Sequence, residues 1–274
     1  MGNFSEHYYR DFQIPKRRGS RTIHAPRVAL KVIQRWIHDH MLAGQPLTSE
    51  VNAFAPERSI FTNAGRHLGR KNFLALDVAE FFLSIGKPLV QRVFEGIGYN
   101  PLVAHQLASL CTLGGGLPQG APTSPMLSNL IFQSVDEQLK NFAITWNAEY
   151  SRYADDLAFT SDSHYFGPED VAAVGAALKT IGLQLNERKT KRIGGGYRHE
   201  VAGLSTTSAG AMPARWKRRQ WRATFHNAEL DPGVFTERTN ELLGIAGYVG
   251  QYDPQLGERY KAIVQHTLVR THRG

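Results

Sequence analysis

Two adjacent carboxylates interrupt an apolar run between residues 150 and 160, and this local conflict constrains the fold more than any other feature. The flanking Tyr, Leu and Phe residues favour a β-strand, whereas Asp does not. Asp155 and Asp156 therefore lie either in the turn of a strand hairpin or at a functional site that overrides local preference. The pair alone favours neither interpretation, so the rest of the sequence has to decide.

Composition places the chain among globular proteins. Its 274 residues are 42% hydrophobic and 20% charged, which provides enough apolar material for a large core and more than one subdomain. No apolar run is long enough to span a membrane, and the first residues lack the apolar centre of a signal peptide, so we expect no membrane association. The single cysteine, Cys111, allows no intramolecular disulfide, and we expect it in the core of a cytoplasmic protein.

Charge is unevenly distributed along the chain. The net charge is +8, which favours a polyanionic partner. Residues 1–35 carry eight Lys or Arg against two acids, and residues 213–274 carry ten against six, while the acidic pair lies between them. Basic flanks around an acidic centre suit a protein that binds phosphates and holds cations centrally. A plain basic surface would give the same net charge, so this interpretation stays open.

Hydrophobic spacing and turn residues predict the order of the elements. After an amphipathic lead-in at 4–14, we expect strands around a basic Gly turn at 14–26, at 73–78, in a hairpin at 152–161 and at 200–206. Helices are expected at 28–43, at 87–111 in two pieces broken near Gly98 and Pro101, at 123–142 with Ser124 as N-cap, at 168–182, 213–229 and 238–250. This order predicts an α+β catalytic core followed by an all-α tail.

A third carboxylate, Asp77, ends the buried strand at 73–78. Three carboxylates suit a site for two divalent cations, which clamp the attacking and leaving oxygens of a phosphoryl transfer. Asp77 can meet Asp155 and Asp156 only if their strands lie side by side. Between them, residues 117–125 form a loop rich in Pro and Gly that could present Gln119 and backbone N–H groups to a nucleotide, although a rigid structural turn is the alternative.

Four segments occur in a fixed order: residues 77–85, Leu-Pro-Gln-Gly-Ala-Pro-Thr-Ser-Pro at 117–125, Tyr-Ala-Asp-Asp at 153–156, and Gly-Leu-Gln-Leu-Asn-Glu-Arg-Lys-Thr at 182–190. Together they resemble the ordered motif set of reverse transcriptases, from about Ile14 to Gly203 with a thumb after it. The resemblance implies a right-hand polymerase fold with fingers, an antiparallel-sheet palm and a helical thumb. It assigns 1–72 to the fingers and lead-in, 73–86 to the first palm strand, 87–116 to fingers-side helices, 117–207 to the palm and 208–274 to the thumb.

Two further segments resemble bacterial retron reverse transcriptases. Residues 63–67, Asn-Ala-Gly-Arg-His, are similar to their Asn-Ala-x-x-His element. Val-Ala-Gly at 201–203 stands where retrons usually carry Val-Thr-Gly, so Ala202 departs from the pattern. This departure leaves open how strictly the template-specific contact of that region is kept.

The resemblance implies roles for individual residues. Asp77, Asp155 and Asp156, with the Val78 carbonyl, would hold two Mg²⁺ ions, with Mn²⁺ as a substitute. Nucleotide binding would involve Lys16 and Arg21 at the β- and γ-phosphates, Phe82 as a steric gate against ribose, Gln119, and Lys189 at the triphosphate. Ordinary packing is the alternative for Phe81 and Phe82, of which we expect Phe81 inside and Phe82 at the sugar. A solvated basic turn is the alternative for Lys16 and Arg21.

Contacts to nucleic acid follow from the same resemblance. Tyr153 would lie under the primer end, and Asn63 and His67 would contact RNA, although His67 could instead be local scaffolding. Basic residues interleave with two indoles at 213–222, where Trp216 and Trp221 would either stack on unpaired bases or pack in the core. The basic residues expected to bind nucleic acid there are Arg215, Lys217, Arg218 and Arg222.

The implied function is RNA-templated DNA synthesis from deoxynucleoside triphosphates. A retron enzyme would copy part of its cognate structured non-coding RNA into a branched, RNA-linked single-stranded DNA, within an anti-phage defence system that includes a separate effector or toxin protein. Another bacterial reverse transcriptase, of the abortive-infection or diversity-generating type, is the first alternative. A catalytically idle RNA-binding scaffold of the same fold is the second.

Overall fold

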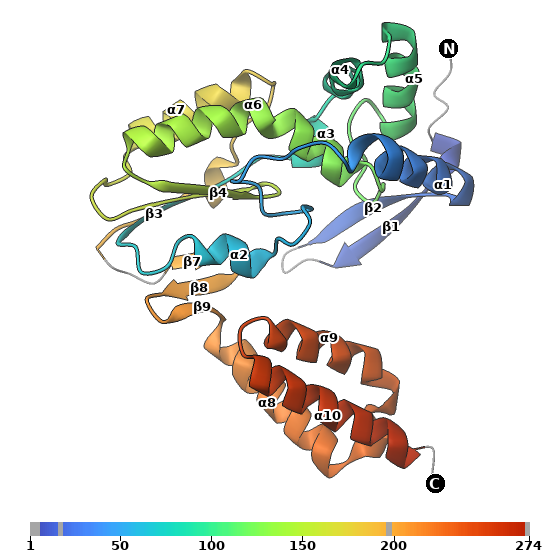
Figure 1. The fold of residues 1–274 in the computed structure, drawn as a ribbon, viewed down its shortest axis with the longest axis vertical. Helices are drawn as coiled ribbons and strands as arrows, with labels where there is room; N and C mark the ends of the chain where they lie inside the picture. The colour runs from blue at the N-terminus through green and yellow to red at the C-terminus, as the bar shows by residue number, and fades with distance from the viewer. Residues whose placement is uncertain (1–5, 16–18, 196–198, 272–274) are drawn as a thin grey trace.

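The computed structural model describes residues 6–15, 19–195 and 199–271, arranged as a larger α/β part above a bundle of three helices (Figure 1). The bundle consists of α8 Arg215–Leu230, α9 Thr239–Gly250 and α10 Pro254–Thr271. A small sheet of β7 His199–Val201, β8 Leu204–Thr207 and β9 Gly210–Pro213 lies between the two parts. The prediction of an α+β core with a helical tail is therefore confirmed.

The central sheet has four strands in the order β4-β5-β3-β6, and every neighbouring pair is antiparallel. Its strands are β3 Asn72–Asp77, β4 Glu149–Tyr153, β5 Asp156–Ser161 and β6 Lys191–Ile193. β3 is flanked on both sides and is buried almost throughout, which suits its apolar sequence. The hairpin predicted at 152–161 is confirmed as β4 and β5.

Two longer helices cover one face of this sheet, and the short helix α2 and the β7–β9 sheet cover the other. α6 Ser124–Thr145 and α7 Pro168–Lys179 lie over the first face, where Leu74, Leu76, Leu157 and Phe159 join the main core. α2 Ile60–Gly65 and the β7–β9 sheet cover Phe73 and Ala158 on the second face. Because side chains alternate along a strand, Asp77 and Asp156 belong to this second face.

The N-terminal hairpin and four helices form one end of the larger part. β1 Tyr9–Pro15 pairs with β2 Ser20–Pro26, and α1 Val28–Ile37, α3 Phe81–Ser84, α4 Lys87–Ile97 and α5 Pro101–Cys111 follow in the chain. The predicted break between α4 and α5 is confirmed, since Gly98 (φ +114°) ends α4 and the Asn100 side chain caps α5 before Pro101. Cys111 is buried as expected, and burial raises its pKa to about 12.

Several predicted boundaries are wrong in detail. Residues 9–14 of the expected lead-in belong to strand β1, and the helix from residue 28 passes into a π-helical segment at His38–Leu42. Thr123, not Ser124, is the N-cap residue of α6, and α7 ends at Lys179. The single strand expected at 200–206 is two strands, because Ala202 (φ +48°) and Gly203 (φ +79°) form the turn between β7 and β8.

The helix bundle has its own core. Phe225 of α8 stacks on Tyr260 of α10 with ring centroids 3.8 Å apart. Gly250 and Gly257 let α9 and α10 cross closely, because a Cβ atom on Gly257 would lie 2.5 Å from the Gly250 Cα atom. Within the residues that the structure describes, no helix is both long enough and apolar enough to cross a membrane.

Candidate active site

The strand register brings the three predicted carboxylates together. Asp77, the last residue of β3, lies directly opposite Asp156, the first residue of β5. Asp155 occupies the two-residue turn between β4 and β5, and its carbonyl accepts a hydrogen bond from the Val78 N–H at 2.9 Å. The Asp77 carbonyl accepts from the Asn186 N–H at 2.7 Å, which ties the segment before Lys189 to the same point. The strands thus lie side by side, as the proposed site requires.

The turn that presents Asp155 is strained. Ala154 adopts φ +55°, in the left-handed region that favours Gly, and such a conformation persists only where its surroundings determine it. Its carbonyl accepts a hydrogen bond from Arg152 Nη1 at 3.4 Å. A buried arginine therefore supports the turn from beneath.

Arg152 is the centre of a buried polar cluster that sequence reasoning missed. Its guanidinium is fully buried and makes a forked ion pair with Asp136 of α6, with Nη2–Oδ2 2.7 Å and Nε–Oδ1 2.9 Å. Arg152 Nη1 also donates to Asn129 Oδ1 at 3.0 Å, and the Tyr150 hydroxyl donates to Asp136 at 2.8 Å. A buried pair with its hydrogen bonds satisfied fixes geometry more than it adds stability. The only sequence signal was a charged residue on an otherwise apolar face of the 123–142 helix.

Burial and the charges of neighbouring carboxylates both raise pKa values at this site. Burial, followed by the charges of Asp155 and Asp77, raises the pKa of Asp156 to about 6, although this carboxylate keeps an exposed edge. Burial also raises the pKa of Asp155, with Asp77 adding to the rise and Lys189 and Arg21 opposing it. Like charges directly opposite each other are destabilising, so this site favours a positive charge between the carboxylates.

Lys189 supplies one such positive charge. Its Nζ atom donates to Asp77 Oδ2 at 2.6 Å, with Asp77 buried and Lys189 mostly exposed. Burial alone would lower the Lys189 pKa, but the hydrogen bond to Asp77 and the charges of all three carboxylates raise it. Lys189 therefore lies at the carboxylates rather than apart from them.

The carboxylate oxygens of this site suit hard divalent cations, but they are not already arranged as a complete coordination shell. Carboxylate oxygens are the ligands that Mg²⁺ prefers, and the raised pKa values of Asp155 and Asp156 show a site that a cation would relieve. Among the described residues, no three His, Cys, Asp or Glu side chains are already arranged around one point. Asp77 would have to exchange the Lys189 ammonium for an ion.

The loop at 117–125 is locked against the N-terminal hairpin. The Gln119 carbonyl accepts a hydrogen bond from the His24 N–H at 2.7 Å, while the residue itself remains half-buried. At Gly120 (φ +117°), a Cβ atom would lie 2.8 Å from Ile23 Cγ2, so only Gly allows this approach. Arg21 shares a strand face with Ile23, and its charge acts on Asp155. Lys16 lies outside the described residues.

The two phenylalanines after Asp77 differ in burial. Phe81 is 4% exposed and packs against Phe132 of α6, with centroids 5.9 Å apart. Phe82 is half-buried, and its ring also meets Phe54, 6.3 Å away. Phe81 thus belongs to the core, whereas Phe82 packs against that core and keeps part of its surface exposed.

Asn63 and His67 are both buried, which argues against direct contact with RNA. His67 is fully buried, and its two ring nitrogens are hydrogen-bonded to Thr160 Oγ1 at 2.8 Å and Ser151 Oγ at 2.7 Å. Burial lowers the pKa of His67 to about 3, so the ring stays neutral and links β4 to β5. Asn63 is 2% exposed. The scaffolding alternative for His67 is the one that the structure supports. Tyr153 remains half-buried in β4.

The basic segment of α8 presents most of its charge to solvent. Arg215, Lys217 and Arg222 are exposed, whereas Arg218 is half-buried and its Nε atom donates to the Pro213 carbonyl at 3.1 Å. The two indoles have different surroundings. Trp216 is 62% exposed with Lys217 Nζ 5.7 Å from its ring, whereas Trp221 is half-buried against Tyr248 of α9, 5.4 Å away.

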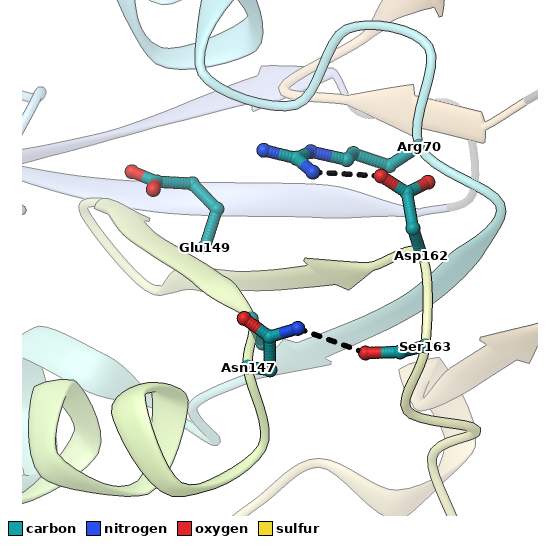
Figure 2. Close-up of a pocket in the computed structure, with 6 residues that line it drawn as sticks. Arg70, Asn147, Glu149, Asp162 and Ser163 are labelled. Carbon is teal, nitrogen blue, oxygen red and sulfur yellow. Dashed lines mark hydrogen bonds and ion pairs between the residues drawn. The ribbon is translucent and has the colours of Figure 1, made fainter.

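A separate hollow of about 310 Å³ is lined by Arg70, Glu149 and Asp162, among others (Figure 2). It lies at the opposite end of β4 and β5 from the carboxylates, because Glu149 is at the start of β4 and Asp162 follows the end of β5. Arg70 and Asp162 form an ion pair across it at 2.7 Å, and the Asn147 amide donates to Ser163 Oγ at 3.0 Å. The Glu149 carboxylate is paired with Arg66, so the charged groups of the hollow already have partners, and its walls are mostly exposed. We therefore place the chemistry at the carboxylates and not at this hollow.

Comparison with known proteins agrees with this geometry. The family model described as reverse transcriptase (RNA-dependent DNA polymerase) matches residues 14–224. The chain belongs to the reverse transcriptase family. It is 33% identical to the retron Mx65 reverse transcriptase of Myxococcus xanthus, over 92% of this chain and 63% of that protein. It is 30% identical to the retron Ec86 reverse transcriptase of Escherichia coli, over 88% of this chain and 74% of that protein.

Solved structures support the fold. A foamy viral protease–reverse transcriptase, determined in complex with double-stranded DNA, matches with a TM-score of 0.53 and 17% identity, over 96% of this chain and 39% of that chain. The telomerase of Candida albicans matches with a TM-score of 0.51 and 11% identity, over 81% of this chain and 50% of that one. The polymerase fold predicted from the motifs is thus confirmed, and the chain spans about two thirds of the length of its M. xanthus relative.

Proposed function

We propose that this reverse transcriptase chain copies RNA into DNA by two-metal phosphoryl transfer at Asp77, Asp155 and Asp156. The observation that carries the proposal is the register, which sets Asp77 opposite Asp156 with Asp155 in the adjoining turn. Two Mg²⁺ ions held by these carboxylates and the Val78 carbonyl, with Mn²⁺ as a substitute, would activate the primer hydroxyl and neutralise the leaving pyrophosphate.

The remaining residues of the site would bind and orient the substrates. Lys189 would leave Asp77 for the triphosphate of the incoming nucleotide and donate a proton to pyrophosphate. Arg21 would bind the outer phosphates, a role also proposed for Lys16. Gln119 would contact the nucleotide, and the Phe82 ring would crowd a ribose 2′-hydroxyl. These roles are supported by the exposed positions of Arg21 and Lys189 beside the carboxylates.

Nucleic acid would reach the site along basic surfaces. Tyr153, next to the carboxylate turn, would support the primer end, and Arg215, Lys217, Arg218 and Arg222 of α8 would bind template or product phosphates. Trp216 is exposed among these charges and could stack on an unpaired base. Trp221 is excluded from that role by its packing against Tyr248.

We further propose that the template is a cognate structured RNA and the product a branched, RNA-linked single-stranded DNA. The relatives named as retron reverse transcriptases support this substrate. A role in anti-phage defence, beside a separate effector protein, belongs to the same proposal. Ala202, in place of Thr, removes a hydroxyl from the β7–β8 turn, where φ +48° disfavours a β-branched residue.

Primer extension tests the proposal directly. The purified chain with its co-purified RNA, Mg²⁺ and labelled deoxynucleotides should yield DNA that stays attached to RNA until ribonuclease treatment. The Asp155→Asn, Asp156→Asn protein should yield none, and Asp162→Asn, at the far end of β5, is the matched control. Free DNA without an RNA linkage would favour another class of bacterial reverse transcriptase. No DNA from the wild type would leave only the scaffold alternative.

A further inference from the structure

Phe54 is a large apolar side chain held in an unusual place. It is 50% exposed and adopts φ +57°, in the left-handed region that bulky residues rarely enter. The three residues before it, Val51, Asn52 and Ala53, are all buried. A buried segment therefore ends at a residue with a strained backbone and an exposed ring. Backbone strain of this kind is concentrated at functional sites.

The backbone before Phe54 is fixed by the same buried cluster that supports the carboxylate turn. The Asn129 amide donates to the Ala53 carbonyl at 3.0 Å, while its oxygen accepts from Arg152 at 3.0 Å. The Asn52 N–H donates to the Arg152 carbonyl at 2.8 Å. Asn129 thus connects the position of Phe54 with that of the turn at Ala154 and Asp155.

The Phe54 ring faces Phe82. Their centroids are 6.3 Å apart with planes inclined at 50°, within the range of favourable aromatic pairs. Phe81 also meets Phe82, with ring centroids 5.3 Å apart. Phe82 therefore contacts both a core ring and an exposed ring, and these contacts restrict its side-chain rotation.

We propose that Phe54 is a specificity-determining residue, which positions the Phe82 ring against the sugar of the incoming nucleotide. The inference rests on the proposed function, because it assigns Phe82 to the sugar. Phe54 acts through Phe82, so it is a positioning residue. Without it, Phe82 gains rotational freedom and yields to a 2′-hydroxyl, while the carboxylates keep their arrangement.

Single-nucleotide incorporation measures this effect, with each deoxynucleotide compared with its ribonucleotide. For Phe54→Ala, we expect the preference for deoxynucleotides to fall about three- to tenfold, as for the loss of one aromatic contact, with little change in deoxynucleotide incorporation. Phe82→Ala should lower the preference further. Tyr165→Ala removes a 70% exposed ring beyond the far end of β5 and should leave the preference unchanged.

Asn129→Asp tests the connection behind Phe54. Aspartate keeps an acceptor for Arg152 but loses the donor to the Ala53 carbonyl. The preference for deoxynucleotides should therefore fall, as expected for Phe54→Ala. Thermal unfolding shows whether this buried variant is folded, and an unchanged preference in a folded Asn129→Asp protein would remove Asn129 from the proposal. Because the Phe54 side chain is exposed, Phe54→Ala should leave the packing of the core unchanged.

The outcomes separate this inference from the proposed function. If Phe82→Ala loses the preference and Phe54→Ala keeps it, Phe54 has no role in selectivity and the inference is wrong. If Phe54→Ala lowers incorporation of both nucleotides equally, Phe54 is a general binding residue, which also overturns it. A wild-type protein that makes no DNA would instead contradict the proposed function.

Discussion

The two ends of the β4–β5 strand pair carry opposite electrostatic arrangements. At the turn, Asp155 and Asp156 lie beside Asp77, and the pKa of Asp156 is raised to about 6 by burial and by its neighbours. At the open end, Asp162 is paired with Arg70, and this hydrogen bond, ahead of a small opposing effect of burial, lowers the pKa of Asp162. The two ends belong to one pair of strands, so the difference lies in their surroundings.

This difference distinguishes a site from a surface hollow. At the open end, Arg70 is paired with Asp162 and Asn147 with Ser163, and adding a ligand there would break these pairs (Figure 2). At the turn, the Lys189 ammonium is paired with Asp77. A bound cation would supply further positive charge to the three carboxylates. In this protein, the clustered carboxylates at the turn therefore indicate the active site better than the surface hollow does.

The largest expected effect is on activity at the turn. Asp155→Asn or Asp156→Asn should lower the rate of DNA synthesis by about 10³-fold or more, because a metal-binding carboxylate is lost. Asp156→Asn should at the same time raise the free energy of unfolding at pH 7 by roughly 1 kcal/mol, a value discounted for the exposed edge of the carboxylate. Primer extension and denaturant unfolding measure the two effects.

The pH dependence checks the cause of that stabilisation. The folded state binds a proton more tightly at Asp156 than the unfolded state does, so wild-type stability contains a penalty above pH 6 that disappears as pH falls toward 4. The stability difference between Asp156→Asn and wild type should shrink over the same interval. A difference that stays constant from pH 7 to pH 4 would contradict the raised pKa of Asp156 as the cause.

Arg152 should show the largest effect on stability. Arg152→Met leaves Asp136 charged and buried without its partner, which should lower the free energy of unfolding by about 3–5 kcal/mol. Replacing the whole cluster, as Arg152→Met, Asp136→Leu and Tyr150→Phe together, should recover most of this loss. Activity should stay low, because the Ala154 carbonyl still lacks its donor. Wild-type activity in the triple variant would mean that the cluster has no part in holding the turn.

His67 should set a pH dependence of stability through the middle of the same strands. Its pKa is about 3 in the folded protein, so between pH 6.5 and pH 3 the unfolded state binds the extra proton, and stability falls as pH falls. The loss attributable to His67 should reach about 3 kcal/mol at pH 4. Subtracting the unfolding curve of His67→Asn isolates it from the opposite trend of Asp156. Equal pH slopes in both proteins would contradict a buried neutral ring.

Local sequence signals predicted the parts of this molecule that depend on local chemistry. Gly98 and Pro101 separated α4 from α5 because each restricts the backbone on its own. The carboxylate hairpin was one of two interpretations of Asp residues between apolar runs. The meeting of Asp77 with the pair was expected only if their strands lie side by side, and the register shows that they do. The order of the motifs added the polymerase fold.

Long-range pairings were beyond the same reasoning. Arg152 and Asp136 meet only because β4 lies over α6, and neither residue signals the other in the sequence. His67 was expected at RNA because a motif residue suggests contact, whereas its hydrogen bonds to Ser151 and Thr160 arise from tertiary packing. Gly250 of α9 approaches Gly257 of α10 closely, and neither glycine signals the other in the sequence.

The smallest effect is expected at the open end. Arg70→Ala breaks an exposed ion pair with Asp162, and such pairs contribute about 0.2–1 kcal/mol, so unfolding should change by no more than that. DNA synthesis should be unchanged, because the hollow that Arg70 lines is separated from the carboxylates by the length of β5. Primer extension with Arg70→Ala beside Asp155→Asn makes the comparison within one assay. A loss of activity in Arg70→Ala comparable to that in Asp155→Asn would show that the open end takes part in synthesis, and that charge balance fails to distinguish the two ends.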